Sequence, residues 1–258
     1  MSRVGGLTPI LLACFSALAL AQAPKPPAYE PSLGQDGKDV VWVPTPQATA
    51  DKMLDLARVG PKDFVIDLGS GDGRLVIGAA KRGARALGVE YNPELVELSR
   101  RNAEREGVAD RAKFEKADLF ETDFSQASVI TMFLLTSINL QLRPKLLALK
   151  PGTRIVSNTF GMGDWAPDES AELGLDACNE SWCSALLWIV PARVAGTWRV
   201  PQGELKLEQD FQNLSGTLTA GGITVALREG KVRGEEIRFT ANGRPYRGRL
   251  KGGKLELR

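Results

Sequence analysis

Between residues 40 and 195, short apolar runs alternate with longer stretches in which apolar side chains recur every three or four positions. The short runs have the length of buried strands, and the longer stretches have the period of helices with one buried face. We expect strands at 64–68, 85–90, 113–117, 128–134, 153–158 and 184–190, and helices at 48–59, 74–82, 93–106 and 139–148. This alternation predicts an α/β fold, a Rossmann-like doubly wound sheet with helices on both faces, whose last strand fits an antiparallel edge hairpin.

The pattern changes after Pro191. From residue 196 onward, strand-like segments are separated by glycine-containing turns such as Asn242-Gly243, which are typical of hairpins. The expected strands are 197–200, 204–209, 215–219, 223–228, 231–234, 236–241, 244–251 and 254–257. We therefore expect residues 196–258 to form a second, small antiparallel β domain that closes into a barrel or sandwich with a packed core.

The first 23 residues have the layout of a secretory signal peptide. Arg3 supplies the charged start, an apolar stretch runs to Leu20, and small-x-small cleavage sites end at Ala21 and Ala23. The apolar stretch is short for a bilayer span, although an uncleaved N-terminal membrane anchor is the alternative. We predict an exported, periplasmic protein with a proline-rich linker at 24–39, followed by the α/β domain at 40–195.

The end of the first expected strand carries the strongest chemical signal. The run Asp67-Leu68-Gly69-Ser70-Gly71-Asp72-Gly73-Arg74 joins this strand to a helix, and the next strand ends in Glu90. Glycines at alternate positions let the backbone turn tightly and approach a ligand closely. A strand, a glycine-rich turn, a helix and a second strand with a terminal acid form a nucleoside-binding unit. The Asp67 carboxylate would repel a diphosphate but suits a cationic ligand.

This turn resembles that of class I S-adenosylmethionine (SAM) methyltransferases, and the resemblance extends to the third strand, which is followed by Asp118-Leu119. It implies SAM as the cofactor, with Asp67 on the methionine amino group, Glu90 on the ribose, and Asp118 and the Leu119 N–H on the adenine. The other residues implied to line the site are Gly69, Ser70, Gly71, Gly73, Tyr91 and Asn92. Taken alone, Asp118 also fits a helix cap, and Tyr91 also fits ordinary core packing.

A finer resemblance is carried by Val43-Pro44-Thr45-Pro46, which precedes the glycine turn. The mitochondrial lysine methyltransferases that modify the ATP synthase c-subunit, and their bacterial relatives, carry a similar segment together with the same type of turn. The resemblance implies that Thr45 closes over the methionine end of SAM and that the acceptor is a protein lysine, with a membrane-proximal substrate as an option. A small-molecule amine acceptor and a catalytically silent SAM-binding module are the alternatives. From the residues alone, Pro44-Thr45-Pro46 is a rigid lead-in to a helix.

The segments after the fourth and fifth strands bear on the acceptor. Nucleic-acid amino-methyltransferases of this class carry Asn/Asp-Pro-Pro-Tyr/Phe after the fourth strand, whereas this chain has Met132-Phe133-Leu134-Leu135, so we expect no nucleic-acid partner. Past the fifth strand, Asn158, Asp164 and Trp165 are candidates for the acceptor side, because an indole face beside a carboxylate can hold an amine. A tryptophan in that loop equally fits a cover over the core.

Composition narrows the chemistry further. The chain has no histidine, and its three cysteines include no CxxC pair, so we expect neither a histidine-based triad nor a metal site. A net charge of +2 gives no indication of a nucleic-acid surface. Cys178 and Cys183 either form a disulfide in an oxidising compartment or stay free thiols. No catalytic residue is singled out, because methyl transfer from a sulfonium is a single displacement in which the protein chiefly aligns the reactants.

Overall fold

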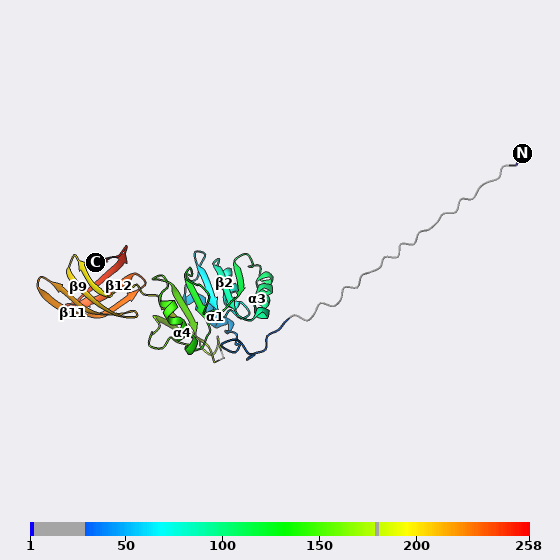
Figure 1. Ribbon diagram of the computed structural model, residues 1–258, viewed down its shortest axis with the longest axis horizontal. Coiled ribbons are helices and arrows are strands. Elements are labelled where there is room, and N and C mark those ends of the chain that lie inside the picture. The colour runs from blue at the N-terminus through cyan, green and yellow to red at the C-terminus, as the bar shows by residue number, and fades with distance from the viewer. Residues whose placement is uncertain (3–28, 179–180) are drawn as a thin grey trace.

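The computed structural model describes residues 1–2, 29–178 and 181–258, which form two sheets (Figure 1). Apart from Met1 and Ser2, the predicted leader lies outside the described residues. The elements of the first domain are α1 (Gln47–Leu56), β1 (Phe64–Leu68), α2 (Arg74–Lys81), β2 (Arg85–Glu90), α3 (Pro93–Arg105), β3 (Ala112–Lys116), β4 (Val129–Met132), α4 (Thr136–Leu147), β5 (Arg154–Asn158), β6 (Glu169–Glu172) and β7 (Ser184–Ile189). Those of the second are β8 (Gly196–Val200), β9 (Gly203–Asp210), β10 (Asn213–Ala220), β11 (Ile223–Arg233), β12 (Glu236–Ala241), β13 (Arg244–Lys251) and β14 (Lys254–Leu257).

The first sheet has the strand order β3-β2-β1-β4-β5-β7-β6. β1 pairs in parallel with β2 and with β4, and β7 runs antiparallel to both β5 and β6. The strand order reverses between β1 and β4, and open α/β sheets bind ligands at the carboxyl ends of the strands at such a point. The predicted Rossmann-like fold with an antiparallel edge hairpin is confirmed.

Helices cover both faces of this sheet, and each face has its own apolar core. Successive residues of a strand point to opposite faces, so Val65 packs with Met53 and Leu54 on one side, whereas Ile66 packs with Leu142 on the other. This burial from two sides explains why the strands read as continuous apolar runs. None of the helices in the described part of the chain combines the length and the apolar character needed to span a bilayer.

Two expectations about strands were wrong. β6 was missed because it is a short polar segment. It pairs with β7 at the edge of the sheet, where its side chains stay partly or fully exposed and need not be apolar. The expected strands 223–228 and 231–234 are one strand, β11, with an irregularity between Arg228 and Lys231. Glu229 adopts φ 54° there, so the dipeptide Glu229-Gly230 marks a bulge and not a turn.

The second sheet is a seven-stranded antiparallel meander from β8 to β14, and it is a small β domain as predicted. The sheet curls until β14 approaches β8 (Figure 1). Its interior is filled by apolar side chains such as Leu205, Leu218 and Phe239. The barrel-like unit therefore has a packed core, as the alternating pattern predicted.

The two domains meet through Phe211, which lies between β9 and β10. Its ring stacks on Trp165 with the centroids 5.9 Å apart, and the Arg143 guanidinium lies 5.4 Å from its centroid. The Ala192 N–H also donates to the Gly234 carbonyl at 2.8 Å, just past the end of β7. The β domain is thus attached near the amino ends of β5 and β6. The expected ligand-binding site lies at the carboxyl ends of the strands, on the opposite side of the sheet.

Candidate active site

The glycine turn after β1 has the conformation that its sequence predicts. Gly69, Gly71 and Gly73 have φ values of 77°, 53° and 85°, which favour glycine. A Cβ atom on Gly71 would lie 2.8 Å from Trp42 Nε1, and one on Gly73 would lie 2.8 Å from the Phe114 ring. The turn therefore has no room for side chains at Gly71 and Gly73, because Trp42 and Phe114 pack against its backbone.

Helix α3 holds this turn in place. Ser99 Oγ donates to the Gly71 carbonyl at 2.7 Å, and Asn102 Nδ2 donates to the Asp72 carbonyl at 2.9 Å. Sequence reasoning missed both positioning residues, because their partners are backbone atoms of a distant segment. A signal was available for Ser99, which falls on the buried side of α3 together with Leu95.

Asp67 is a buried carboxylic acid at the end of β1, and it accepts a hydrogen bond from Thr131 Oγ1 at 2.6 Å. Burial raises the pKa of Asp67 to about 7, and the nearby Glu90 and Asp72 add to this effect. A cationic group beside the carboxyl would favour its charged form. Asp67 therefore fits the amino group of a methionine moiety, as the sequence predicted.

Glu90 joins the glycine turn to the start of α3. Its Oε2 accepts from the Gly71 N–H and its Oε1 from the Asn92 N–H, both at 2.9 Å. Each carboxylate oxygen keeps a further lone pair, which is what two ribose hydroxyls require. The Asn92 side chain caps α3 by accepting from the Glu94 N–H at 2.8 Å, so the structure gives Asn92 a helix-capping role that the sequence interpretation did not include.

Asp118 lies just past β3, and its two oxygens have different partners. Oδ1 accepts from the Phe120 N–H at 2.9 Å, and Oδ2 accepts from Lys38 Nζ at 2.5 Å. The Lys38 ammonium holds the pKa of Asp118 below its ordinary value. Lys38 Nζ also lies 5.3 Å from the Tyr91 ring centroid and 5.9 Å from that of Phe120. This lysine was not predicted from the sequence, because the segment that carries it looked like a linker.

Part of this set lines one hollow at the carboxyl edge of the sheet, under the segment 35–43. The predicted cofactor residues that line it are Gly69, Glu90, Tyr91, Asn92, Asp118 and Leu119. Ser70 lies beneath the turn, with its Oγ buried and without a hydrogen-bond partner in the described part of the chain. The three acids and the glycine turn are therefore brought to one edge, as the nucleoside-binding interpretation requires, and their chemistry matches the amino and hydroxyl groups of SAM.

Arg74 connects Thr45 to the glycine turn. Its carbonyl accepts from Arg74 Nη1, and the Arg74 guanidinium also forms two hydrogen bonds with the Asp72 carboxylate. The Thr45 side chain is buried. This geometry supports the placement of Thr45 near the methionine end of the site, and its contact with SAM stays a prediction.

Three aromatic rings from distant segments meet beside the hollow. Phe133 stacks on Phe160 with the centroids 6.0 Å apart, and it meets Trp182 edge-on at 5.9 Å. Phe133 also lines the hollow together with Gly69. Sequence reasoning missed this aromatic cluster, because each ring is a single apolar residue in its own loop. Its available signal was the position of Phe133 directly after β4.

A disulfide stands next to Trp182. Cys178 and Cys183 are bonded, with their Cα atoms 5.8 Å apart, so the structure favours the disulfide over the free thiols. Thr49 Oγ1, on α1, donates to the Trp182 carbonyl at 3.3 Å. Trp182 is therefore tied both to the disulfide and to the first helix.

The acceptor-side role predicted for Asp164 and Trp165 does not fit the structure. Trp165 is fully buried against Trp188 and Phe211, so its indole presents no face to an amine, and it covers the core as the alternative held. Asp164 pairs with Arg143 on the surface.

Asn158 lies closer to the aromatic cluster, because its carbonyl accepts from the Phe160 N–H at 2.6 Å. Its side chain is buried at the end of β5, and Nδ2 has no hydrogen-bond partner among the described residues. A buried donor of this kind is costly unless a ligand satisfies it. The acceptor-side role of Asn158 stays a prediction.

Comparison with known proteins agrees with this geometry. Residues 67–169 match the profile of the ANTKMT methyltransferase domain. A protein-lysine N-methyltransferase of Saccharolobus islandicus is 48% identical over 133 residues, which cover 50% of this chain and 83% of that protein. The ATP synthase c-subunit lysine N-methyltransferase of Rattus norvegicus is 44% identical over 48% of this chain, and the chain spans 56% of its length.

A solved structure is also similar. The crystal structure of an RNA methyltransferase from Salinibacter ruber, in complex with S-adenosyl-L-homocysteine, is 47% identical with a TM-score of 0.55, and the match covers 59% of this chain and 96% of that one. That similar structure was solved with S-adenosyl-L-homocysteine bound. The chain therefore belongs to the ANTKMT-type family of class I SAM-dependent methyltransferases.

Proposed function

We propose that the protein methylates the ε-amino group of lysine in a protein substrate. The observation that carries this proposal is the 48% identity to the protein-lysine N-methyltransferase of S. islandicus, a match that covers 83% of that protein. The two further relatives from Rattus norvegicus and Mus musculus are named for lysine methylation of the ATP synthase c-subunit and of adenine nucleotide translocase. The chain spans 56% of each of these, so their substrates are suggestions and not assignments.

The site has the features that lysine methylation needs. SAM supplies an electrophilic methyl group, and the reaction is an in-line displacement that depends on alignment. Asp67 and Glu90 fix the cofactor end of this alignment. On the acceptor side, a lysine amine must be neutral to attack, although its free pKa is about 10.4. The aromatic cluster of Phe133, Phe160 and Trp182 offers an apolar surface, and desolvation there lowers the pKa of an amine.

The test is a transfer assay with SAM that carries a deuterated methyl group. We expect mass spectrometry to find labelled lysine in a purified ATP synthase c-subunit, and no label when that lysine is replaced by arginine. Free lysine, as a small-molecule amine, serves as the comparison. Labelling of free lysine but not of the protein would contradict the proposal and favour a small-molecule methyltransferase.

RNA methylation is a second candidate, because the similar solved structure from S. ruber is described as an RNA methyltransferase. The segment after β4 speaks against it. Met132-Phe133-Leu134-Leu135 stands where the Asn/Asp-Pro-Pro-Tyr/Phe tetrapeptide that stacks a base would lie, and it contains no proline. The same labelled SAM offered with total RNA distinguishes the two, since label in digested nucleosides would support this second candidate.

We also propose that the protein works outside the cytoplasm. The disulfide between Cys178 and Cys183 supports this, because such bonds persist mainly in oxidising compartments. The signal-peptide layout of residues 1–23 points the same way. Mass spectrometry of the protein isolated from its native cells tests the proposal: we expect a terminus at Gln22 or Pro24, and an intact Met1 or Ser2 terminus on a soluble species would contradict it.

A further inference from the structure

The outer face of the β domain carries a row of four cations, which we call the basic row: Lys231, Arg238, Arg247 and Arg258. Lys231 is the direct cross-strand neighbour of Arg238, and Arg238 is the neighbour of Arg247. Arg247 and Arg258 exchange two backbone hydrogen bonds, at 3.0 and 2.7 Å. All four side chains are exposed. The row thus places like charges directly opposite one another across four neighbouring segments, an arrangement that destabilises a sheet.

The next row, two residues along the strands, is built in the opposite way. Arg233 lies opposite Glu236, Glu236 opposite Arg249, and Arg249 opposite Glu256, so that the signs alternate. This row compensates its charges, as sheets usually do. The basic row therefore lacks the alternation of positive and negative charges that the adjacent row shows.

The three arginines of the basic row have no anionic partner among the described residues, whereas the Lys231 ammonium lies close enough to Asp168 to act on the pKa of that carboxyl. Within the described residues, the guanidinium groups of Arg238, Arg247 and Arg258 form no ion pair or hydrogen bond. Lys231 Nζ donates to the neutral side chain of Asn213. Internal structure therefore does not account for this concentration of charge, whereas an external anion would.

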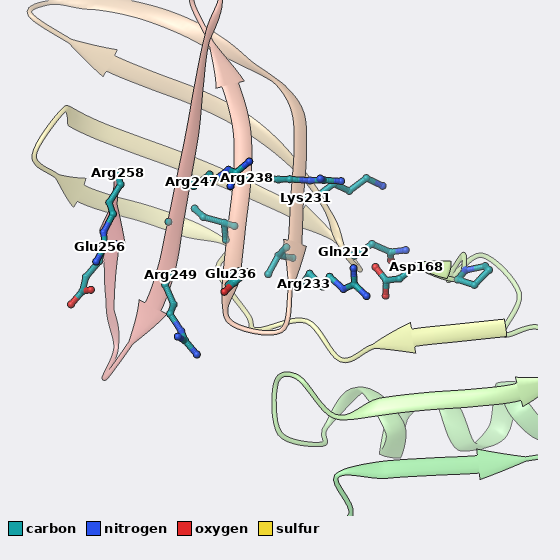
Figure 2. A pocket seen from close by; sticks show the side chains of 14 residues that line it. Asp168, Gln212, Lys231, Arg233, Glu236, Arg238, Arg247, Arg249, Glu256 and Arg258 are labelled. Carbon is teal, nitrogen blue, oxygen red and sulfur yellow. The ribbon is translucent and has the colours of Figure 1, made fainter. Parts of the chain in front are cut away.

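The row lines an open hollow of about 680 Å³ between β11–β14 and the residues that precede β6. Figure 2 shows the labelled side chains of the basic row above those of the alternating row, with Asp168 and Gln212 at the far end. None of the residues that line this hollow in the described part of the chain is aromatic. Nucleic-acid grooves commonly use aromatic rings to stack bases, and this hollow has no such ring.

We propose that the basic row docks an acidic segment of the protein substrate, an inference that rests on the proposed lysine methyltransferase function. Arginine forks match carboxylates in two-point hydrogen bonds. Three strand spacings of about 4.8 Å give the row a length of roughly 14 Å. The row is bordered by Glu236, Glu256 and Asp168. A broad polyanion such as a nucleic-acid duplex or a membrane surface would meet these acids as well, whereas a single extended acidic chain can follow the row alone.

The position of the hollow sets a minimum spacing, along the substrate chain, between its acidic segment and its methylated lysine. Asp168 precedes β6 at the amino edge of the first sheet, whereas the SAM site lies at the carboxyl edge, and β5 with its five residues separates the two edges. That length is about 17 Å, which an extended chain covers with roughly five residues or more. We therefore expect the acidic segment of a substrate to lie at least that far along the chain from its acceptor lysine.

The test measures binding of a fluorescein-labelled octaglutamate peptide to the full-length protein by fluorescence polarisation. We expect salt-dependent binding that Arg238→Glu weakens at least tenfold. The same variant should raise the Tm, because it places an acid between Lys231 and Arg247. A merely structural cation would lower the Tm when replaced. The matched control is Arg244→Glu, an exposed arginine at the start of β13 outside the hollow, which should leave peptide affinity unchanged.

Equal affinity of the unmodified protein and of Arg238→Glu for octaglutamate would overturn the proposal. It would also fall if an octameric oligouridylate, or vesicles of phosphatidylglycerol, bound the row more tightly than the peptide and lost this binding in Arg238→Glu. The measurement needs no methyl transfer. Protein methylation without peptide binding would therefore refute the docking site alone, and peptide binding without lysine methylation would refute the proposed function alone.

Discussion

Lys38 and Asp118 are 80 residues apart in the sequence, and their side chains are bonded at the entrance to the adenosine end of the site, with Lys38 Nζ 2.5 Å from Asp118 Oδ2. The same ammonium group lies over the rings of Tyr91 and Phe120. Asp118 is the acid that the family resemblance assigns to the adenine amino group. An adenine bound as the resemblance implies would therefore compete with the Lys38 side chain for one carboxylate oxygen and for the space between two rings.

We predict that Lys38→Met binds S-adenosylhomocysteine more tightly than the unmodified protein, by about two- to tenfold. The variant keeps an apolar stem over the rings but removes the cation that adenine would have to displace, and an exposed ion pair of this kind is weak, so the gain is modest. Isothermal titration calorimetry measures the change. Lys52→Met, on α1, is the control and should have no effect. Weaker binding in Lys38→Met would show instead that Lys38 closes over the bound cofactor.

Asp67 predicts a pH dependence of cofactor affinity. Its pKa in the protein is about 7, against 3.8 for the free side chain, so the carboxyl is largely protonated below pH 6 and charged above pH 8. A cationic ligand binds the charged form. We therefore expect the affinity for S-adenosylhomocysteine to rise as the pH increases from 6 to 8, with proton release on binding that calorimetry in buffers of different ionisation enthalpy detects.

The same shift predicts how Asp67→Asn behaves. Because the folded-state pKa is raised, the folded protein binds more protons than the unfolded chain between pH 3.8 and about 7. The stability contribution of Asp67 is therefore lost as the pH rises through that window, by on the order of 4 kcal/mol at most. Asp67→Asn should raise the Tm of the free protein at pH 8, leave it nearly unchanged at pH 4, and weaken cofactor binding by about 1.5–3 kcal/mol. A lower Tm at pH 8 would show that the charged carboxylate supports the fold.

The position of Trp182 predicts that its loss lowers turnover of the acceptor without changing cofactor affinity. Its ring completes the aromatic cluster on Phe133 and Phe160, beside the hollow that Glu90 and Asp118 line. We expect Trp182→Ala to lower kcat/KM for a lysine substrate by about tenfold, because the ring supplies part of the apolar surface that desolvates the acceptor amine and lowers its pKa. The affinity for S-adenosylhomocysteine should stay the same.

Two further variants control this prediction. Trp182→Phe keeps a ring and should recover most of the activity. Cys178→Ser removes the neighbouring disulfide and should lower activity in the same direction as Trp182→Ala. If both Trp182 variants instead lost cofactor affinity, the cluster would belong to the SAM site and not to the acceptor.

The sequence predicted those parts of the site that come from one continuous segment. The run from Asp67 to Gly73 requires positive φ at fixed positions, and Glu90 follows from the length of one βαβ unit, so local rules were enough for both. The central strands β1, β4 and β5 were equally predictable, because burial on two faces makes them largely apolar, whereas the polar edge strand β6 was missed. Local patterns also predicted the meander of the second domain, although a bulge at Glu229 has the same dipeptide signature as a turn.

Contacts between distant segments could not be predicted in the same way. Lys38 lies in a segment that looks like a linker, and its partner Asp118 is recognised only in the folded chain. The prediction of acceptor-side residues failed for a related reason. Trp165 follows the fifth strand, which is the right place for a ligand contact, but Phe211 of the second domain packs over it. No local pattern in residues 40–195 indicates that a later domain covers this loop.

Phe211 predicts that the β domain stabilises the methyltransferase domain without taking part in its cofactor site. Its ring stacks on Trp165 and lies under Arg143, at the sheet edge opposite to Asp67 and Glu90. We expect Phe211→Ala to lower the free energy of unfolding by about 1–3 kcal/mol, below the usual cost of a fully buried Phe→Ala change because the ring is only half-buried. Denaturant unfolding followed by tryptophan fluorescence measures this loss. Phe211→Leu, which keeps an apolar contact, should recover part of it. Titration with S-adenosylhomocysteine should give the same affinity for all three proteins, because the contact lies at the far edge of the sheet. A fall in cofactor affinity that matches the fall in stability would show instead that the β domain helps to shape the SAM site.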